Sequence, residues 1–439
     1  MKEHFFRITR IQTNELTAAL LSFAYFFCVL SAYYVLRPLR EEMGLAGGVD
    51  NLPWLFMGTL SATLLLVPFV GYLVSRYSRT RFISYSYRFF AFNLLIFYGL
   101  MWFSSDQLNV YLGRVFYIWL SAFNMFVVSV FWSFMADGFG YRRSKRLFAF
   151  IAAGGTIGAI TGSGLTAFLV EIVGRLHLML CSVVLLELAV QLVRALDKQF
   201  NKLDKEEPQL QVEAVGERNL WQQLTDGVRL AISSPFMLGI SLYLLLYPFL
   251  TTFLYFEQAH IINDAVQSRE ERAAIFAQID LWVNVLTLVL QLFVTGRLMQ
   301  IFSVGVMLMI LPTLTVLGFI SLANAPILMV LVIFQIIRRA GSYAITRPVR
   351  ETLFTLLDRD HKYKAKNFID TFVYRTGDAL SAGLNGILAS LSFTVSAVAW
   401  VAVPFAGLWV ATAYWLGLKQ KQLYDSRKHE AEIHQGVEQ

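Results

Sequence analysis

Apolar runs of about 20 residues alternate with short polar stretches along most of the chain. The runs cover residues 17–36, 52–74, 83–104, 109–134, 147–170, 176–196, 235–257, 279–299, 302–322, 326–346, 367–391 and 393–417. An α-helix of this length crosses the hydrocarbon core of a bilayer. Because lipid offers no partner to an unpaired backbone amide, we expect each run to cross as one helix. The pattern predicts an all-α polytopic membrane protein with twelve transmembrane helices.

Composition agrees with this pattern. The chain has 439 residues, of which 56% are hydrophobic and 15% are charged. Soluble domains average about 45–50% apolar and about 25% charged residues. A chain this long and this apolar would lack the polar surface to cover itself in water. The composition therefore excludes an ordinary soluble enzyme, and also a disordered or fibrous chain.

Motifs for bound groups are missing from the sequence. We find no phosphate-binding Gly-x4-Gly-Lys-Ser/Thr loop, no His-Glu-x-x-His zinc pattern and no Gly-x-Ser-x-Gly nucleophile turn. The two cysteines, Cys28 and Cys181, lie inside apolar runs and are interpreted as packing residues. We expect no metal, no cofactor and no enzymatic activity, and nothing indicates transport driven by ATP hydrolysis.

Lys and Arg concentrate in the loops that follow the even-numbered runs and in the C-terminal tail. Loops with this excess of basic residues face the cytoplasm, so both termini are expected there. The net charge of +7 is then a feature of membrane topology, and we expect no nucleic-acid polymer as a partner.

Residues 198–218 are the one long polar linker, and they divide the runs into six and six. The predicted domains are an N-terminal half (1–197), a cytoplasmic linker with an amphipathic segment (198–234), a C-terminal half (235–418) and a cytoplasmic tail (419–439). This 6+6 layout is typical of the major facilitator fold, whose halves contain inverted three-helix repeats. The turn at 71–81 resembles the facilitator loop signature in part, with Ser75 and Ser78 in place of its Asp and Gly.

One short pattern occurs twice. Residues 33–41 and 343–351 both fit Tyr-x3-Arg-Pro-x-Arg-Glu, at the outer end of the first run and the inner end of the tenth. Proline interrupts the helical hydrogen bonds, and Arg and Glu four residues apart can pair. One interpretation is that each copy is a helix boundary. The other is a charged gate at each end of one pathway, with these residues as gate pairs: Arg37, Glu41, Arg347 and Glu351.

The tenth run carries charge well inside its apolar stretch. Arg338 and Arg339 follow a charge-free segment, and an arginine at such depth normally faces a cavity or a partner. Arg339, Tyr343 and Arg350 recur at spacings of four and seven, near one helical face.

The eleventh run contains acidic residues, with Asp370, Tyr374 and Asp378 following one another at a spacing of four. Asp370 and Asp378 share a face, beside Arg375. One interpretation is a set of salt bridges that only hold the bundle together. Arginines outnumber these acids, however, and the guanidinium fork suits phosphate or carboxylate. We therefore also interpret Asp370 and Asp378 as groups that orient arginines around an anion. The candidate anion contacts are Arg40, Arg339, Tyr343, Arg350 and Arg375.

Two further features come from single runs. Glu187, in the middle of the sixth run, is a candidate proton-coupling group or the partner of a neighbouring arginine, whereas Glu257 and Asp280, at run ends, are interpreted as interfacial anchors. The glycines of the fifth run predict a close helix crossing: Gly154, Gly155, Gly158 and Gly162.

Segment 339–383 resembles the ATP/ADP translocases of plastids and obligate intracellular bacteria. The family's tenth-span region runs Tyr-Ser, Asp-Pro-Thr-Lys-Glu and a Lys-x-Lys-Gly-Lys loop. On this resemblance Pro348, Arg350 and Glu351 match its Pro, Lys and Glu, and Arg40 takes a first-span lysine position. The remaining matches are Lys364 and Lys366 for loop lysines and Asp370 for its acid. The resemblance implies a bacterial relative that exchanges solutes across the inner membrane through twelve helices.

These features lead to one hypothesis and two alternatives. The first is a secondary active transporter, monomeric, that moves a small anionic and phosphate-bearing solute such as a nucleotide by alternating access. The second is a proton-coupled major facilitator carrier or exporter of another anionic metabolite, a siderophore or a peptide, in which Glu187 carries the proton. The third, of another class, is a non-transporting membrane scaffold or sensor.

Overall fold

The computed structural model describes residues 12, 15–76, 79–206, 234–353, 369 and 373–437, and the regular elements within these ranges are all helices. The chain divides into two compact units. Unit 1 contains Met1–Glu213 and Val266–Asn284, and unit 2 contains Ala214–Ala265 and Val285–Gln439.

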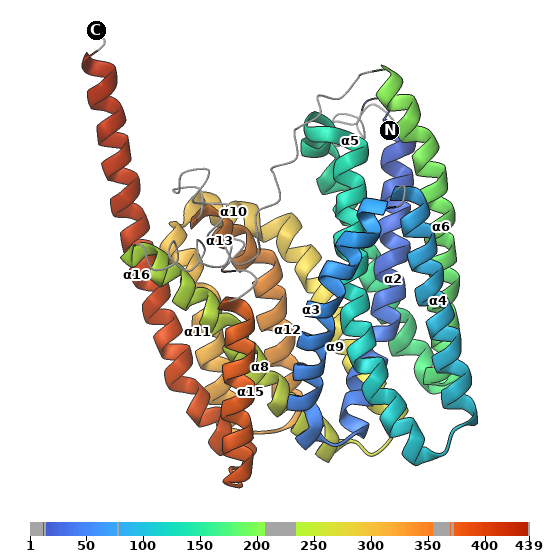
Figure 1. Ribbon diagram of the computed structural model, residues 1–439. Coiled ribbons are helices and arrows are strands. Elements are labelled where there is room, and N and C mark those ends of the chain that lie inside the picture. The colour runs from blue at the N-terminus through green and yellow to red at the C-terminus, as the bar shows by residue number, and fades with distance from the viewer. Residues whose placement is uncertain are drawn as a thin grey trace. The chain divides into compact units, whose positions relative to one another are not determined.

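Unit 1 is a bundle built around helix α2, which contacts α5 and α6 along its length (Figure 1). Its elements are α2 (Leu16–Ala46), η1 (Val49–Asn51), α3 (Leu52–Arg76), α4 (Arg79–Phe103), α5 (Asp106–Val173), α6 (Arg175–Glu206) and the first part of α9 (Arg269–Leu290).

The close crossing of α2 and α5 depends on glycine. A Cβ atom at Gly154 or Gly158 would lie 2.5 or 2.4 Å from the carbonyl oxygens of Phe23 and Phe27. Hydroxyl groups add bonds across the same crossing, as when Ser31 Oγ donates to the Gly158 carbonyl at 3.0 Å. The predicted crossing is confirmed, and it is the small-residue packing expected of membrane helices.

Helix α5 differs from the prediction. The fourth and fifth runs were expected as two helices joined by a loop, but the helix continues for 68 residues through the basic stretch between them. Two segments of α5 are long and apolar enough to cross a membrane, Asp106–Phe139 and Arg146–Val173. The intervening stretch has no proline to break the helix, and Lys and Arg are good helix formers.

Unit 2 is built around helix α8, which contacts α12, α15 and α16 (Figure 1). Its elements are α8 (Pro235–Ala265), the rest of α9, η2 (Gln291–Thr295), α10 (Gly296–Ile301), α11 (Val304–Asn324), α12 (Leu328–Gly341), η3 (Ser342–Thr346), α13 (Arg347–Leu353), α15 (Tyr374–Ser390) and α16 (Val395–Val437). The C-terminal part of α16 extends beyond the other helices of this unit (Figure 1).

Two π-helical turns, η2 and η3, interrupt α9–α10 and α12–α13 and pack against each other. Thr295 Oγ1 lies 3.0 Å from the carbonyl oxygen of Ala344. Pro348, four residues after Ala344, has no N–H to offer that carbonyl. The hydroxyl from η2, which also lies 3.1 Å from the Leu290 carbonyl oxygen, is within reach to offer the Ala344 carbonyl a donor that Pro348 does not have.

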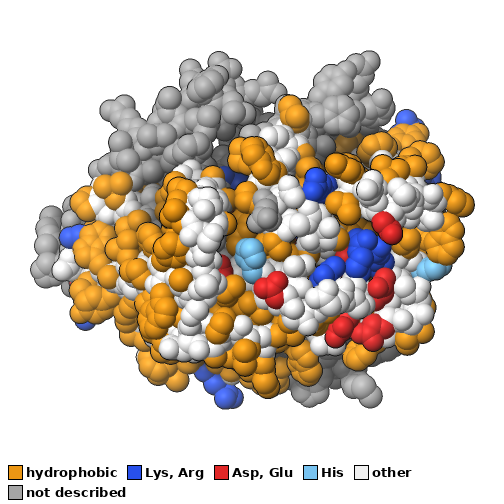
Figure 2. Space-filling model, turned by 90° about the horizontal axis from the view of Figure 1, so that it is seen from below, with side chains coloured by type: hydrophobic (Ala, Val, Ile, Leu, Met, Phe, Trp, Pro, Cys, Tyr) orange, Lys and Arg blue, Asp and Glu red, His pale blue; other side chains and the backbone are white. Residues whose placement is uncertain are grey.

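Large apolar side chains are widely exposed. The exposed fraction is 73% for Trp54, 75% for Leu65 and 88% for Phe103. Figure 2 shows hydrophobic side chains over much of the face seen from below, with basic and acidic side chains gathered among them. The described part of the chain holds nine helices long and apolar enough to cross a membrane. This combination indicates a multi-pass membrane protein.

Candidate functional site

A cavity of about 420 Å³ opens within unit 2, between α8, the η3–α13 segment and α15. Of the nine lining residues that the structure describes, three are arginines, three are tyrosines and none is acidic. The lining residues are Tyr243, Leu244, Tyr247, Ser342, Thr346, Arg347, Arg350, Tyr374 and Arg375.

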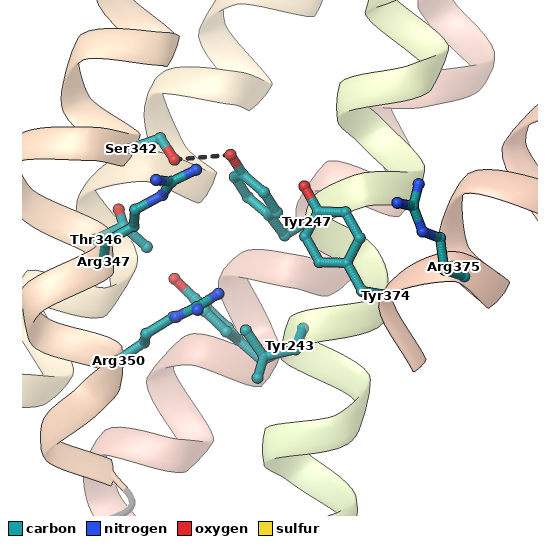
Figure 3. Close-up of a pocket in the computed structure, with 9 residues that line it drawn as sticks. Tyr243, Tyr247, Ser342, Thr346, Arg347, Arg350, Tyr374 and Arg375 are labelled. Atoms are coloured by element: carbon teal, nitrogen blue, oxygen red, sulfur yellow. Dashed lines mark hydrogen bonds between the residues drawn. The ribbon is translucent and has the colours of Figure 1, made fainter. Parts of the chain in front are cut away.

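The η3 turn sets the direction of two of the arginines. Arg347 and Arg350 are three residues apart in α13 and so lie on one helical face. A π-turn contains one residue more than an α-helical turn. Each residue after it is therefore rotated by about 100° about the helix axis, relative to its position in an uninterrupted α-helix. Figure 3 shows both side chains pointing from this segment toward the tyrosines of α8.

Tyrosines form the opposite wall. Ser342 Oγ donates to the hydroxyl oxygen of Tyr247 at 2.8 Å, and the rings of Tyr247 and Tyr374 lie 5.9 Å apart between centroids (Figure 3). The guanidinium carbon of Arg347 lies 4.4 Å from the ring centroid of Tyr343, a cation–π distance. The wall therefore offers aromatic faces as well as hydroxyl groups.

Two carboxylates contact the arginines from outside the lining. Arg350 Nε lies 3.5 Å from Glu351 Oε1, and Arg375 Nη1 lies 3.6 Å from Asp378 Oδ2. Asp378 also accepts a hydrogen bond from Thr252 Oγ1 at 2.7 Å, which holds it toward α8. Among the described residues, these two acids thus contact two of the three arginines that line the cavity.

The cavity brings together part of the predicted site. Arg350 and Arg375 line it, and Tyr343 stacks beneath Arg347. Arg347, expected in a gate pair, is itself a lining residue. Arg339 is not among the nine lining residues.

Other predicted residues lie elsewhere. Asp370, Lys364 and Lys366 fall outside the described residues. Arg40 belongs to unit 1, where its Nη1 donates to Ser121 Oγ at 3.0 Å and its guanidinium lies 4.7 Å from the Tyr117 ring centroid.

Four polar residues of the cavity wall were not predicted from the sequence: Tyr243, Tyr247, Ser342 and Thr346. Tyr243 and Tyr247 are four residues apart, and a search for aromatic pairs at helical spacing could have found them.

The first copy of the repeated pattern lies inside α2, which continues through Pro38 to Ala46. The interpretation of this copy as a helix boundary is therefore wrong. Arg37 pairs with Asp280 and lies 3.9 Å from Glu41, and Arg40 Nη2 lies 2.5 Å from the same Glu41 oxygen. The copy is a network of ion pairs within unit 1.

Glu42, the next residue, is the centre of a second network. Its side chain is fully buried, and its oxygens lie 3.0 Å from Arg175, 2.6 Å from Arg269 and 3.8 Å from Arg272. Gly174, with φ of 78°, makes the single-residue turn that ends α5 and places Arg175 at the start of α6.

Three other acids show different environments. Glu187 accepts two hydrogen bonds from Arg88, at 3.0 and 2.7 Å, and both side chains are more than 40% exposed. Asp280 and Glu257 were expected as interfacial anchors, but each is only 2% exposed. The helices α8 and α9 extend beyond the apolar runs, which places these residues inside the helical packing.

The fold matches solved structures of membrane transporters at low sequence identity. An auto-inhibited POT family peptide transporter matches with a TM-score of 0.60 and 13% identity, over 92% of this chain and 96% of its own. The peptide transporter PepTSo matches with a TM-score of 0.60 and 15% identity, over 93% and 98%. The nucleoside transporter NupG matches with a TM-score of 0.56 and 14% identity, over 92% and 98%.

No protein-family model matches the chain, and no curated protein matches it significantly. At identities of 13–15% the structural likeness establishes the fold alone. The chain has the major-facilitator-like fold that these transporters share.

Proposed function

We propose that this protein is a secondary active transporter that binds a small anionic, phosphate-bearing solute in the cavity of unit 2 and moves it by alternating access. The observation that carries the proposal is the set of three arginines and three tyrosines around one cavity, whose nine described lining residues include no acid. Twelve spans, in halves 1–197 and 235–418, would supply the two bundles that rock about the bound solute. Both termini would lie in the cytoplasm of a bacterial cell, and the working unit would be a monomer.

The chemistry of the lining supports a phosphate ester over a simple ion. Guanidinium groups bond two phosphate oxygens at once through their planar fork. The faces of Tyr247 and Tyr374 offer a surface for a flat ring, and a cavity of about 420 Å³ is within the range of small-molecule sites. A nucleotide combines these two features, in agreement with the resemblance to nucleotide exchangers.

The remaining predicted residues take supporting roles in this proposal. Arg40 and Arg339 would contact the anion during other steps of the cycle. The pairs Arg37 with Glu41 and Arg347 with Glu351 would act as gates, and Asp378 would orient Arg375 through their 3.6 Å contact.

Thermal shift of the purified protein in detergent tests the proposal. The ligands are ATP, ADP, inorganic phosphate and simple organic acids, and the variants are Arg350→Ala and its control Arg88→Ala. A ligand at one hundred times its dissociation constant stabilises the native state by about 2.7 kcal/mol. We expect stabilisation by phosphate-bearing ligands that is lost in Arg350→Ala and kept in Arg88→Ala, because Arg88 is 42% exposed and pairs with Glu187.

Two results would contradict the proposal. One is the same ligand response in Arg350→Ala and in wild type. The other is no response to any phosphate-bearing ligand, which is also what a scaffold or sensor would give.

A second candidate function is a proton-coupled carrier of another anion. The observation that favours it is Glu257, a buried carboxyl group on α8, the helix that supplies Tyr243 and Tyr247 to the cavity. Glu187, which the sequence analysis considered for this role, is exposed and paired with Arg88.

A further inference from the structure

Glu257 is a carboxyl group in an apolar setting. Its side chain is 2% exposed, and its Oε2 atom is buried with no hydrogen-bond partner among the described residues. One helical turn before and after it on α8 lie Phe253 and Ile261, both buried. The buried acid at Asp280, by contrast, is paired with Arg37.

In the part of the chain that the structure describes, no Lys, Arg or His forms an ion pair with Glu257. Arg338 of α12 donates to Thr251 Oγ1 at 2.9 Å, and Asp378 of α15 accepts from Thr252 Oγ1. Thr251 and Thr252 precede Glu257 by six and five residues, about 9 and 7.5 Å along the helix axis. Neither α11 nor residues 395–418 of α16 contain an Asp, Glu, Lys, Arg or His. On α8 itself, the nearby His260 is partly exposed.

A carboxylate so placed is unfavourable, because burial removes the hydration of Oε2 and no described residue gives this atom a hydrogen bond in exchange. The neutral acid carries no such penalty, so Glu257 holds a proton while it is buried. When a conformational change admits water, the O–H bond breaks, the proton passes to water and the carboxylate is solvated. A group that alternates between these two environments binds and releases one proton in each cycle.

Glu257 is also linked to the anion cavity. The neighbouring Gln258 accepts a hydrogen bond from Gln335 Nε2 of α12 at 2.5 Å, and Arg338 lies 3.4 Å from Gln335 Oε1. Helix α12 continues through η3 into the segment that carries Arg347 and Arg350. Side chains that tie α8 to α12 therefore lie between the carboxyl group and the arginines.

We infer that Glu257 is a proton-binding site that couples anion transport to the proton gradient, an inference that rests on the proposed function. The proton enters with the anion: Glu257 takes it from water on one side of the membrane and releases it to water on the other. A proton gradient then drives accumulation of the anion.

Infrared difference spectra between acidic and alkaline pH test proton binding without any substrate. Wild type, Glu257→Gln and the control Glu187→Gln are compared in detergent. We expect the carbonyl band of a protonated carboxyl group to disappear in Glu257→Gln, to remain in Glu187→Gln and to return, shifted, in Glu257→Asp. A band that Glu257→Gln leaves unchanged would overturn the inference, whatever the protein transports. If Glu257→Gln does not fold, an unshifted band in Glu257→Asp has the same meaning.

Proteoliposomes with labelled ATP or inorganic phosphate test the coupling. We expect Glu257→Gln to lose at least about tenfold in accumulation driven by a pH gradient, while exchange of labelled for unlabelled solute continues, because only the proton-coupled step needs the carboxyl group. Accumulation at the wild-type level in Glu257→Gln would overturn the inference. So would a wild type that exchanges solute but gains nothing from a pH gradient, and that result would leave the proposed function standing. A wild type that neither exchanges nor accumulates would contradict the proposed function itself.

Discussion

The hydroxyl group of Thr295 lies 3.0 Å from the carbonyl oxygen of Ala344, four residues before Pro348, which has no N–H to donate. Gln291, from the same π-turn, reaches the neighbouring Tyr343 carbonyl at 3.5 Å. The η2 turn thus holds the η3 turn in place, and η3 sets the direction of Arg347 and Arg350. The arginines of the cavity therefore depend on a contact with η2, which is not part of the cavity lining.

Replacing Thr295 should weaken anion binding from outside the cavity. Thr295→Val keeps the shape but removes the hydroxyl that lies within hydrogen-bond distance of the Ala344 and Leu290 carbonyl oxygens, a loss of about 1–3 kcal/mol. If half of this free energy is lost from anion binding because α13 becomes less ordered, the affinity falls by about two- to twelvefold. Thermal-shift titration with ATP or inorganic phosphate measures it. Thr295→Ser should bind like wild type, and equal binding by Val and Ser variants would show that the contact has no positioning role.

The helical bundle could be predicted because its signal is strong. Apolar runs of membrane length are unambiguous, and the depth of Arg350 and Arg375 in or near such runs identified two residues of the cavity. The tyrosines could not be selected, because 15% of the chain is aromatic and the rotation of each helix decides which rings face the cavity. The η3 turn depends on a donor from Thr295, about 50 residues earlier in the chain, which no local pattern reveals.

The predicted ends of the helices were less accurate, with consequences for individual acids. Hydropathy locates apolar stretches, but helices continue past them wherever polar side chains find partners. Glu42 lies in such an extension of α2, and Asp280 lies at the start of its run, which α9 extends by ten residues on the N-terminal side; arginines pair with both acids. A reading by hydropathy alone places both at the interface, whereas each is 2% exposed or less.

Arg350→Lys should bind phosphate less tightly although the charge is unchanged. Lysine presents a point charge and cannot form the two parallel hydrogen bonds of a guanidinium fork. Loss of one hydrogen bond to a charged group is worth about 1.5–3 kcal/mol, which is a dissociation constant about 10- to 100-fold higher. Isothermal titration with the best phosphate-bearing ligand gives the constant. Arg297→Lys, at an exposed position on α10, is the matched control, and similar affinities in both variants would argue against a bidentate contact.

Glu42→Gln should destabilise the protein far more than Glu187→Gln does. The buried Glu42 carboxylate neutralises part of the charge of Arg175, Arg269 and Arg272, and removing one partner of a buried ion pair typically costs about 3–5 kcal/mol. Exposed pairs such as Glu187 with Arg88 contribute about 0–1 kcal/mol. Melting temperatures in detergent compare the two substitutions directly. Equal losses would mean that the Glu42 network is solvated and contributes little.

Substitution of glycine by alanine should have opposite effects at two positions of unit 1. A Cβ atom at Gly158 would lie 2.4 Å from the Phe27 carbonyl oxygen, so α2 and α5 must separate, at about 1–3 kcal/mol for an overpacked contact. The hydrogen bond from Ser31 to the Gly158 carbonyl would lengthen with them. A Cβ atom at Gly99 on α4 meets nothing within 4 Å, and there alanine gains about 0.8–1.0 kcal/mol of helix propensity. Thermal unfolding in detergent should therefore lower the melting temperature for Gly158→Ala and raise it for Gly99→Ala. A neutral Gly158→Ala would show that the two helices do not approach each other as closely as these distances require.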